Sequence, residues 1–151
     1  MIEKVQEWAK SKGIYEKSSA TTQQIMMYIE LGEFADEVLK GGTAHNQAME
    51  LGDVIVCLIN YLTMVNDQVS LLDLHGVLDG DYEYDDSFTR DDLLLGFLYA
   101  DDITTFINAI IPLYAMGIGH PVSNCLSMAY HKIINRTGEM KNGKFVKSAD
   151  L

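Results

Sequence analysis

The chain has 151 residues, 48% of them hydrophobic and 22% charged, which is the composition of a folded domain and not of a disordered acidic tail. Eleven lysines and arginines stand against 22 aspartates and glutamates, a formal net charge of −11. Because nucleic-acid binding depends on basic surfaces that contact phosphates, this balance argues against a DNA or RNA partner, and we expect a single domain over residues 1–151.

Capping residues, glycines and prolines mark the ends of the predicted helices. Thr21 or Thr22 caps the first long helix, Thr43 caps the second, and a loop with the sequence DGDYEYDD precedes two more helices. Near the C-terminus Asn142-Gly143 is a strong two-residue hairpin signal. We predict an all-α bundle of four to five helices with a short hairpin-like tail. The expected helices cover residues 5–10, 21–41, 43–66, 89–112 and 121–138, and the expected loop covers residues 67–90. In the helix of 89–112, Thr89 and Asp92 resemble a capping box at the start, and Pro112 kinks or ends the helix.

Two features bear on where the protein works. The only cysteines, Cys57 and Cys125, lie inside apolar stretches, so we expect no disulfide framework and a cytoplasmic setting, and the N-terminal residues do not resemble a signal peptide. Residues 103–130 contain no Asp, Glu, Lys or Arg, but Pro112 and Pro121, with the glycines between them, divide the stretch into pieces too short to span a membrane. We interpret it as a buried helix pair at the interface of a homodimer or homotetramer.

The two predicted long helices carry acids at a helical repeat. Glu30, Glu33 and Glu37 lie three and four residues apart on the first helix, and Glu50 and Asp53 repeat the three-residue spacing on the second. At about 100° per residue, each set falls on one helix face. A tight connection makes the two helices pack antiparallel, so we expect their acidic faces to meet across one groove.

Four carboxylates that converge beside an apolar surface repel one another and lose hydration unless a cation lies among them. Oxygen donors favour a hard divalent cation, so we expect Glu30, Glu33, Glu50 and Asp53 to bind Mg²⁺, with Mn²⁺ as a substitute. The alternative is an ordinary solvated helix face. A single Glu-x-x-Glu pair would favour that alternative, whereas two matched pairs on adjacent helices favour the metal site.

Two other metal sites fit the sequence less well. A carboxylate-bridged redox centre in a helical bundle needs a histidine three residues after a glutamate, and no glutamate here has one. Asp79, Asp81 and Glu83 are spaced as in a calcium-binding loop, but its sixth position lacks glycine and Arg90 stands where a bidentate glutamate belongs. We interpret that segment as a solvated loop.

Basic residues gather at the C-terminal end, where the last twenty positions hold five of the 11 lysines and arginines. Lys132 and Arg136 lie one turn apart on the last predicted helix, and Lys141, Lys144 and Lys147 follow. Such a cluster is suited to a phosphate chain. The alternative is that it favours the helix C-terminus and pairs with surface acids.

The acidic pairs, Glu30-Leu-Gly-Glu33 and Glu50-Leu-Gly-Asp53, resemble the Glu-x-x-Glu and Glu-x-x-Asp signature of the MazG-like all-α nucleoside triphosphate pyrophosphohydrolases. The ending AYHKIINRTGEMKNGKFVKSADL and the opening with its tryptophan are similar to those of small, phage-type members. The resemblance covers residues 5–66 and 120–151. Family members often have a glutamate and a lysine where this chain has Ile29 and Met26, so one group that activates water or supports the metal is missing.

The resemblance implies metal-dependent hydrolysis of a nucleoside triphosphate to the monophosphate and pyrophosphate, in a bacterial or phage-infected cell. The four acids would hold Mg²⁺ ions that bridge phosphate oxygens and lower the pKa of the attacking water. Phage-type members make a deoxypurine triphosphate the expected substrate. The residues assigned on this basis are Lys132, Arg136 and Lys147 for phosphate, and Trp8, Tyr28 and Asn60 for the nucleoside.

Two other functions stay open at this point. The chain could be a non-catalytic helical module that binds a nucleotide or a partner helix, or a phosphohydrolase that acts on monophosphates. The aromatic residues and Asn60 of the expected base pocket could equally be core residues. Magnesium-dependent release of pyrophosphate separates the enzyme from the binding module, and the identity of the product separates the two enzymes.

Overall fold

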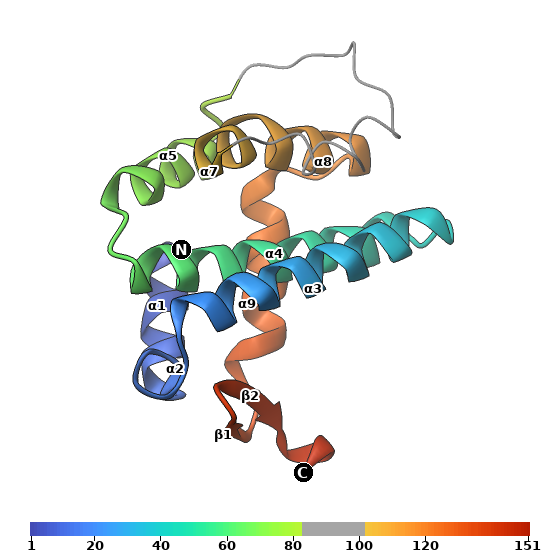
Figure 1. Cartoon of the computed structure of the whole chain (residues 1–151). Helices are drawn as coiled ribbons and strands as arrows, with labels where there is room; N and C mark the ends of the chain where they lie inside the picture. Colours follow the sequence, from blue (N-terminus) through green and yellow to red (C-terminus); the bar gives the residue numbers. More distant parts are fainter. Residues whose placement is uncertain (83–101) are drawn as a thin grey trace.

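The computed structural model describes residues 1–82 and 102–151, in which helices predominate (Figure 1). The all-α class and the short C-terminal hairpin are confirmed, with more helices than the four to five expected. The elements in chain order are α1 (Ile2–Ser11), α2 (Ile14–Lys17), α3 (Ala20–Leu39), α4 (Ala44–Met64), α5 (Gln68–Leu78), α7 (Ile103–Thr105), the π-helical segment η1 (Phe106–Ile110), α8 (Ile111–Ile118), α9 (Val122–Ile134), β1 (Gly138–Lys141), β2 (Lys144–Lys147) and the 3₁₀ turn η2 (Ser148–Asp150).

Helix α4 lies at the centre of the molecule. Residues 51–60 are all buried, and a helix that is buried on every side must be covered by several neighbours. In Figure 1, α3 runs alongside α4, α9 crosses both helices steeply, and α5 and α8 form a layer over α4. The apolar residues of these helices form one continuous core.

A close approach of two backbones fixes the crossing of α4 and α9. A methyl group on Gly52 would lie 2.1 Å from the carbonyl oxygen of Cys125 and 2.7 Å from Cβ of Ala129. Only a residue without a side chain fits at this point, because real Cβ atoms do not approach other atoms so closely. Since Asp53 is the next residue, the same crossing brings α9 against one of the expected metal ligands.

The two long helices begin and end near the expected positions. Ser19 caps α3 by accepting a hydrogen bond from the backbone N–H of Thr22 at 3.1 Å, so the helix begins slightly before the expected cap. Thr43 caps α4 as expected, through the N–H of Asn46 at 3.2 Å. Gly41 has a φ of 72°, a left-handed conformation that lets the chain reverse between the helices.

The prediction of a loop immediately after α4 was wrong, because residues 68–78 form α5. Asp67 caps this helix through the backbone N–H of Ser70 at 3.0 Å. Leu71, Leu74 and Val77 are buried at a helical spacing. This helix is short and its cap is a single aspartate, so the acidic residues that follow it outweighed its apolar repeat in the sequence interpretation.

Residues 83–101 lie outside the described structure, and with them part of the expected acidic loop and the capping box of Thr89 and Asp92. The helix expected there is described from α7 onward. It continues through η1 and α8 and does not end at Pro112, which lies in the first turn of α8. Proline has no N–H to donate to the preceding turn, and the π-helical segment is the local irregularity that accommodates it.

Helix α9 differs from its expected range at both ends. Pro121 is the N-cap residue and not the first helical residue, and the helix ends at Ile134 instead of continuing toward Gly138. Gly138 begins β1, where a side chain would lie 2.1 Å from the carbonyl oxygen of Val146 on the paired strand. This glycine therefore serves the pairing of the strands and does not end the helix.

The C-terminal hairpin turns at Asn142 and Gly143, whose φ values of 50° and 79° are those of the expected tight turn. Two contacts hold the hairpin against the N-terminal helices. Phe145 meets Trp8 edge to face with ring centroids 6.2 Å apart. A Cβ on Gly143 would lie 3.5 Å from the hydroxyl of Thr22, so the turn lies against the start of α3.

In residues 1–82 and 102–151 no single helix is long and apolar enough to cross a membrane; the helices of 103–118 and 122–134 pass that test only together, as a pair bent by 81°. Within residues 103–130 the large apolar side chains are buried or partly buried, so the reason given for an oligomer does not hold. Exposed apolar residues lie instead on α3, at Ile25 and Ile29, and on α5. The homodimer or homotetramer stays a prediction.

Candidate functional site

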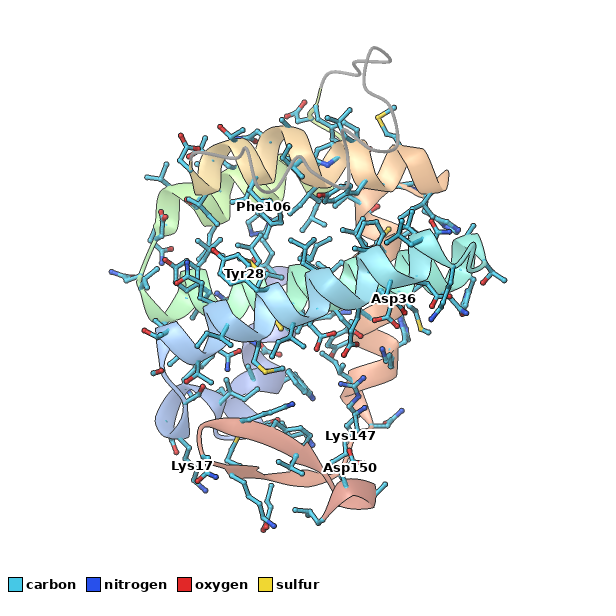
Figure 2. All side chains as sticks on the ribbon, turned by 45° about the vertical axis from the view of Figure 1, so that its right-hand side comes forward. Lys17, Tyr28, Asp36, Phe106, Lys147 and Asp150 are labelled. Atoms are coloured by element: carbon cyan, nitrogen blue, oxygen red, sulfur yellow. The ribbon has the colours of Figure 1, made fainter. Side chains whose placement is uncertain are left out.

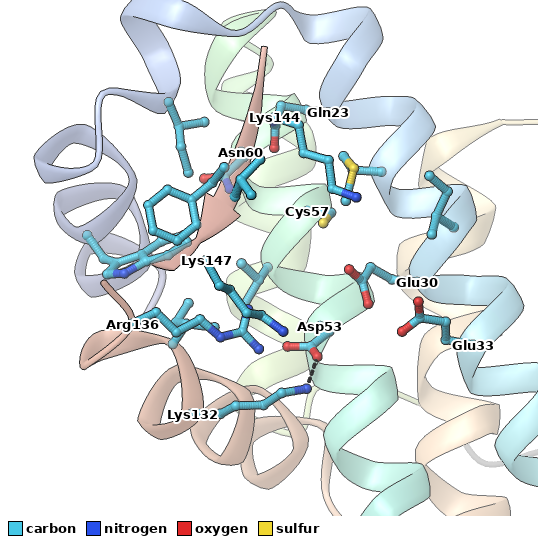
Figure 3. A pocket seen from close by; sticks show the side chains of 18 of the residues that line it. Gln23, Glu30, Glu33, Asp53, Cys57, Asn60, Lys132, Arg136, Lys144 and Lys147 are labelled. Atoms are coloured by element: carbon cyan, nitrogen blue, oxygen red, sulfur yellow. Dashed lines mark hydrogen bonds and ion pairs between the residues drawn. The ribbon is translucent and has the colours of Figure 1, made fainter. Parts of the chain in front are cut away.

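A cavity of about 360 Å³ lies among α3, α4, α9 and the hairpin (Figure 3). Its lining combines carboxylates, cations, amides and aromatic rings. Figure 3 shows the carboxylates of Glu30 and Glu33 along one side and the ion pair of Lys132 with Asp53 at another. The polar and charged residues that line it are Gln23, Glu30, Glu33, Asp53, Asn60, Lys132, Arg136, Lys144, Lys147 and Asp150.

Three of the four expected metal ligands form a tight group. Oxygen atoms of Glu30, Glu50 and Asp53 all lie within 4.8 Å of one another. Glu30 comes from α3, while Glu50 and Asp53 lie one turn apart on α4, so the antiparallel pairing of the two helices brings them together. Glu33 lines the same cavity one turn from Glu30, outside this group of three.

Asp53 forms an ion pair with Lys132, but the two glutamates of this group lack such a partner among the described residues. The pKa of Glu30 is raised to about 7, first by burial and then by the neighbouring charges of Asp53, Glu33 and Glu50, against which Lys132 acts. The pKa of Glu50 is also raised, mainly by burial. Its Oε2 is buried, and no hydrogen-bond partner is found for it among the described residues.

These observations fit a hard divalent cation. The donors are oxygen atoms from two helices, one of them has no hydrogen-bond partner among the described residues, and burial disfavours the charged forms of Glu30 and Glu50. A bound Mg²⁺ would reverse that penalty by offsetting the negative charges. Glu30, Glu50 and Asp53 are the residues placed to hold it, and Glu33 is close enough to the cavity to support them.

Glu37, the third acid of the expected α3 stripe, takes no part in this group. It forms an ion pair with Lys40 at 2.6 Å and accepts a hydrogen bond from the side-chain amide of Asn46 at 3.2 Å. These partners lower the pKa of Glu37, the Lys40 hydrogen bond most. The stripe is therefore divided between a paired acid and unpaired ones.

Four cations line the same cavity. Lys132 of α9 forms an ion pair with Asp53, and the other expected phosphate ligands, Arg136 and Lys147, line the cavity with it. Arg136 stands two residues beyond the end of α9, not on the helix as expected. Lys144, which belongs to the predicted basic cluster, also reaches the cavity.

Two of the three expected nucleoside ligands line the cavity, and one does not. Trp8 and Asn60 are buried in its wall. Tyr28 is half exposed and is absent from the lining. It precedes Glu30 by two residues, about 200° around the helix, and Figure 2 shows it on the side of α3 away from Lys147. The structure therefore does not bring Tyr28 into the cavity with Trp8 and Asn60.

The sequence interpretation gave no role to Gln23, which is 5% exposed and lines the cavity. It precedes Glu30 by seven residues, so the two share one face of α3, and this spacing is the signal that would have found it. Cys57 lines the cavity too, but burial raises the pKa of its thiol far above its usual value. A thiol that stays protonated is a poor nucleophile, so Cys57 is not a candidate reactive group of this site.

Comparisons of the chain with protein-family models, with curated proteins and with solved structures found no match in any of the three.

Proposed function

We propose that the protein is a magnesium-dependent nucleoside triphosphate pyrophosphohydrolase. The observation that carries the proposal is a single cavity lined both by carboxylates of α3 and α4 and by four cations, which are Lys132 of α9, Arg136 just after it, and Lys144 and Lys147 of the hairpin. A magnesium triphosphate has the complementary arrangement, since its metal needs anionic ligands and its free phosphate oxygens need cations.

The proposed metal ligands are Glu30, Glu50 and Asp53, with Glu33 beside them. Mg²⁺ bound there would polarise phosphate oxygens and generate a reactive water, which is the chemistry that hydrolysis of a phosphoanhydride needs. The raised pKa values of Glu30 and Glu50 support this assignment, because charged acids without partners become favourable once a cation binds.

The proposed phosphate ligands are Lys132, Arg136, Lys144 and Lys147. Charge builds up on the leaving pyrophosphate as the bond between the α and β phosphates breaks, and fixed cations stabilise that charge. Lys132 has a second role, because its ion pair offsets the charge of Asp53 before a ligand enters. A metal held by Asp53 would leave the ammonium group of Lys132 available to the phosphates, together with Arg136, which lines the same cavity.

The test measures pyrophosphate released from a panel of nucleoside triphosphates with and without Mg²⁺. We expect turnover only with the metal, and a loss of about a hundredfold or more in Asp53→Asn, which keeps the size of the side chain while removing an anionic ligand. Asp73→Asn on α5 is the matched control, because it removes an aspartate that does not line the cavity. Retention of full activity in Asp53→Asn would contradict the proposal.

The same assay separates the remaining alternatives. A non-catalytic module would be stabilised against heat by magnesium and nucleotide without releasing pyrophosphate, since any ligand of the native state raises the melting temperature. A phosphohydrolase acting on monophosphates would release inorganic phosphate from a nucleoside monophosphate. Arg136→Ala should lower kcat/KM while it leaves stabilisation by Mg²⁺ intact, because it removes a phosphate contact and no metal ligand.

A further inference from the structure

Residues 138–151, which we call the strap, are held together more firmly than they are held to the helices. Strands β1 and β2 pair along their whole length, and the N–H of Ser148 donates a hydrogen bond to the carbonyl oxygen of Thr137 at 2.8 Å. No residue from 134 to 151 is buried. In the part of the chain that the structure describes, no hydrogen bond or ion pair joins the strap to the helices. The strap is therefore one unit with a weak attachment.

The attachment consists of contacts near the turn of the hairpin and a short connection at its base. Phe145 meets the ring of Trp8 edge to face, and the turn at Gly143 lies against Thr22. One aromatic pair and one van der Waals contact contribute little to stability. The connection to α9 is only residues 135–137 long, since that helix ends at Ile134. The strap thus joins α9 at one end and rests on the start of α3 at the other, beside the cavity.

The strap brings cations without partners into the cavity. Lys144 and Lys147 line the cavity, and Figure 3 shows both side chains extending into it. No ion pair is found for either lysine among the described residues. Lys141 on the same hairpin does not line the cavity and lies 3.5 Å from Glu139 as an ion pair. Because like charges repel, the two cavity lysines gain a close partner only when an anion enters the cavity.

The position of the strap decides how many cations such an anion meets. With the strap in place, phosphate groups in the cavity meet Lys144 and Lys147 as well as Lys132 and Arg136. With the strap away, only the two cations next to α9 remain. A ligand shifts a conformational equilibrium by its difference in affinity for the two states. A polyphosphate therefore favours the closed position, whereas a metal ion alone offers these lysines no anion.

We infer that the strap is a lid that opens and closes over the cavity about residues 135–137, and that the polyphosphate of a metal-bound ligand holds it closed through Lys144 and Lys147. Closure of a segment over a bound substrate completes the set of contacts that the reaction needs. The inference rests on the metal and phosphate ligands of the proposed function. It goes beyond that function by making half of the phosphate ligands depend on a movement of the chain.

The chain carries its own probe for this movement. Trp8 is the only tryptophan, it is 9% exposed, and its ring packs against Phe145 of the strap. Opening of the strap exposes the indole, so quenching of its fluorescence by acrylamide reports the open fraction. Inorganic tripolyphosphate is the ligand to use, because it has three phosphates and no base that could stack on the indole.

The experiment compares the acrylamide quenching constant of the protein alone, with Mg²⁺, and with Mg²⁺ and tripolyphosphate, at one ionic strength. We expect Mg²⁺ with tripolyphosphate to lower the constant by about twofold or more, because the ligand moves the population toward the closed state. Mg²⁺ alone should not lower it. The melting temperature in the same three solutions shows independently whether the ligand binds.

Two matched variants show whether the cavity lysines cause the closure. The double variant Lys144→Met, Lys147→Met should lose the fall in the quenching constant. Both lysines are exposed, so without ligand its melting temperature should stay within a few degrees of the natural value. Lys141→Met removes a cation from the same hairpin outside the cavity lining, and should keep the full fall.

The possible failures are distinguishable. If tripolyphosphate raises the melting temperature and leaves the quenching constant unchanged, the hairpin is a fixed wall and the inference is overturned. A fall that persists in the double variant overturns it as well. If neither quantity responds to Mg²⁺ with tripolyphosphate, the phosphate site is absent, and the proposed function fails together with the strap. A strap that closes in a protein that releases no pyrophosphate from any nucleotide would contradict the proposed function alone.

Discussion

Glu30 and Glu37 lie seven residues apart on one face of α3, and each has another ionisable residue three positions further along the helix. For Glu37 that residue is Lys40, and for Glu30 it is Glu33. The pKa of Glu37 is lowered, first by its hydrogen bond with Lys40, whereas the pKa of Glu30 is raised to about 7, first by burial and then by the like charges around it. A paired carboxylate is a structural acid, and a buried carboxylate among like charges is one that needs a cation.

The substitution expected to have the largest effect on this difference between Glu30 and Glu37 is Glu33→Lys. It gives Glu30 the same neighbour at the same spacing that Glu37 has in Lys40, so the pKa of Glu30 should fall. The new ammonium group would also occupy the space where a metal is proposed. We expect a loss of pyrophosphate release of about a hundredfold or more, together with loss of stabilisation by Mg²⁺ in a melting assay.

Glu33→Gln is the control for that experiment. It removes the repulsion between Glu33 and Glu30 without adding a cation, so stabilisation by Mg²⁺ should weaken but persist. If Glu33→Lys were as active as the natural protein, the acids around Glu30 would be a solvated helix face.

The two acidic motifs each contain a glycine, Gly32 on α3 and Gly52 on α4, and the space around these two glycines differs. A methyl group on Gly52 would meet the carbonyl oxygen of Cys125 at 2.1 Å, while one on Gly32 would meet no atom within 4 Å. Gly52→Ala should therefore separate α4 from α9 and lower the free energy of unfolding by about 3 kcal/mol. Gly32→Ala should raise it by about 1 kcal/mol, since alanine favours a helix more than glycine does. Denaturant titration of both variants measures the difference, and equal effects would contradict the crossing.

The sequence allowed the meeting of Glu30 with Glu50 and Asp53 to be predicted, because a three-residue spacing and a tight turn suffice to bring the two helix faces together. The spacing of Glu37 and Lys40, three residues apart, is also visible in the sequence. The hydrogen bond from Asn46 to Glu37 could not be predicted, because it depends on which side chains the turn between α3 and α4 brings within reach.

The differences between expectation and structure have equally physical origins. Tyr28 was chosen for its aromatic ring, although a residue two positions from Glu30 lies on the far side of the helix. Gln23 was given no role, because an uncharged amide does not add to a charge pattern. Helix α5 was predicted as a loop, because the acidic segment that follows it dominates the composition of this part of the sequence.

The two glutamates should also respond to pH in opposite directions. Between about pH 4.5 and 7 the folded protein holds a proton on Glu30 that the unfolded chain releases, so the stability contributed at low pH is lost as the pH rises through this window. Glu37, with a lowered pKa, contributes stability that is lost only as the pH falls below its unfolded value.

Melting temperatures of the natural protein and of Glu30→Gln, measured from pH 5 to 8, test this linkage. The variant should lose less stability as the pH rises, because its side chain does not ionise. Added Mg²⁺ should reverse the trend in the natural protein, since protons compete with the metal for Glu30 and binding strengthens toward pH 8. Identical pH profiles of the two proteins without metal would show that Glu30 titrates normally.

The smallest effect is expected for Lys40→Met, which removes the cation beside Glu37 instead of adding one beside Glu30. Removing the ammonium group deprives Glu37 of its strongest partner and leaves only the amide of Asn46, so the pKa of Glu37 should rise. Because Lys40 is more than half exposed, the melting temperature should fall by only a few degrees. Pyrophosphate release should stay within about twofold of the natural level, since Glu37 lies outside the group formed by Glu30, Glu50 and Asp53. A large loss of activity in this variant would mean that Glu37 also serves the site, and the division of the α3 acids into paired and unpaired groups would be wrong.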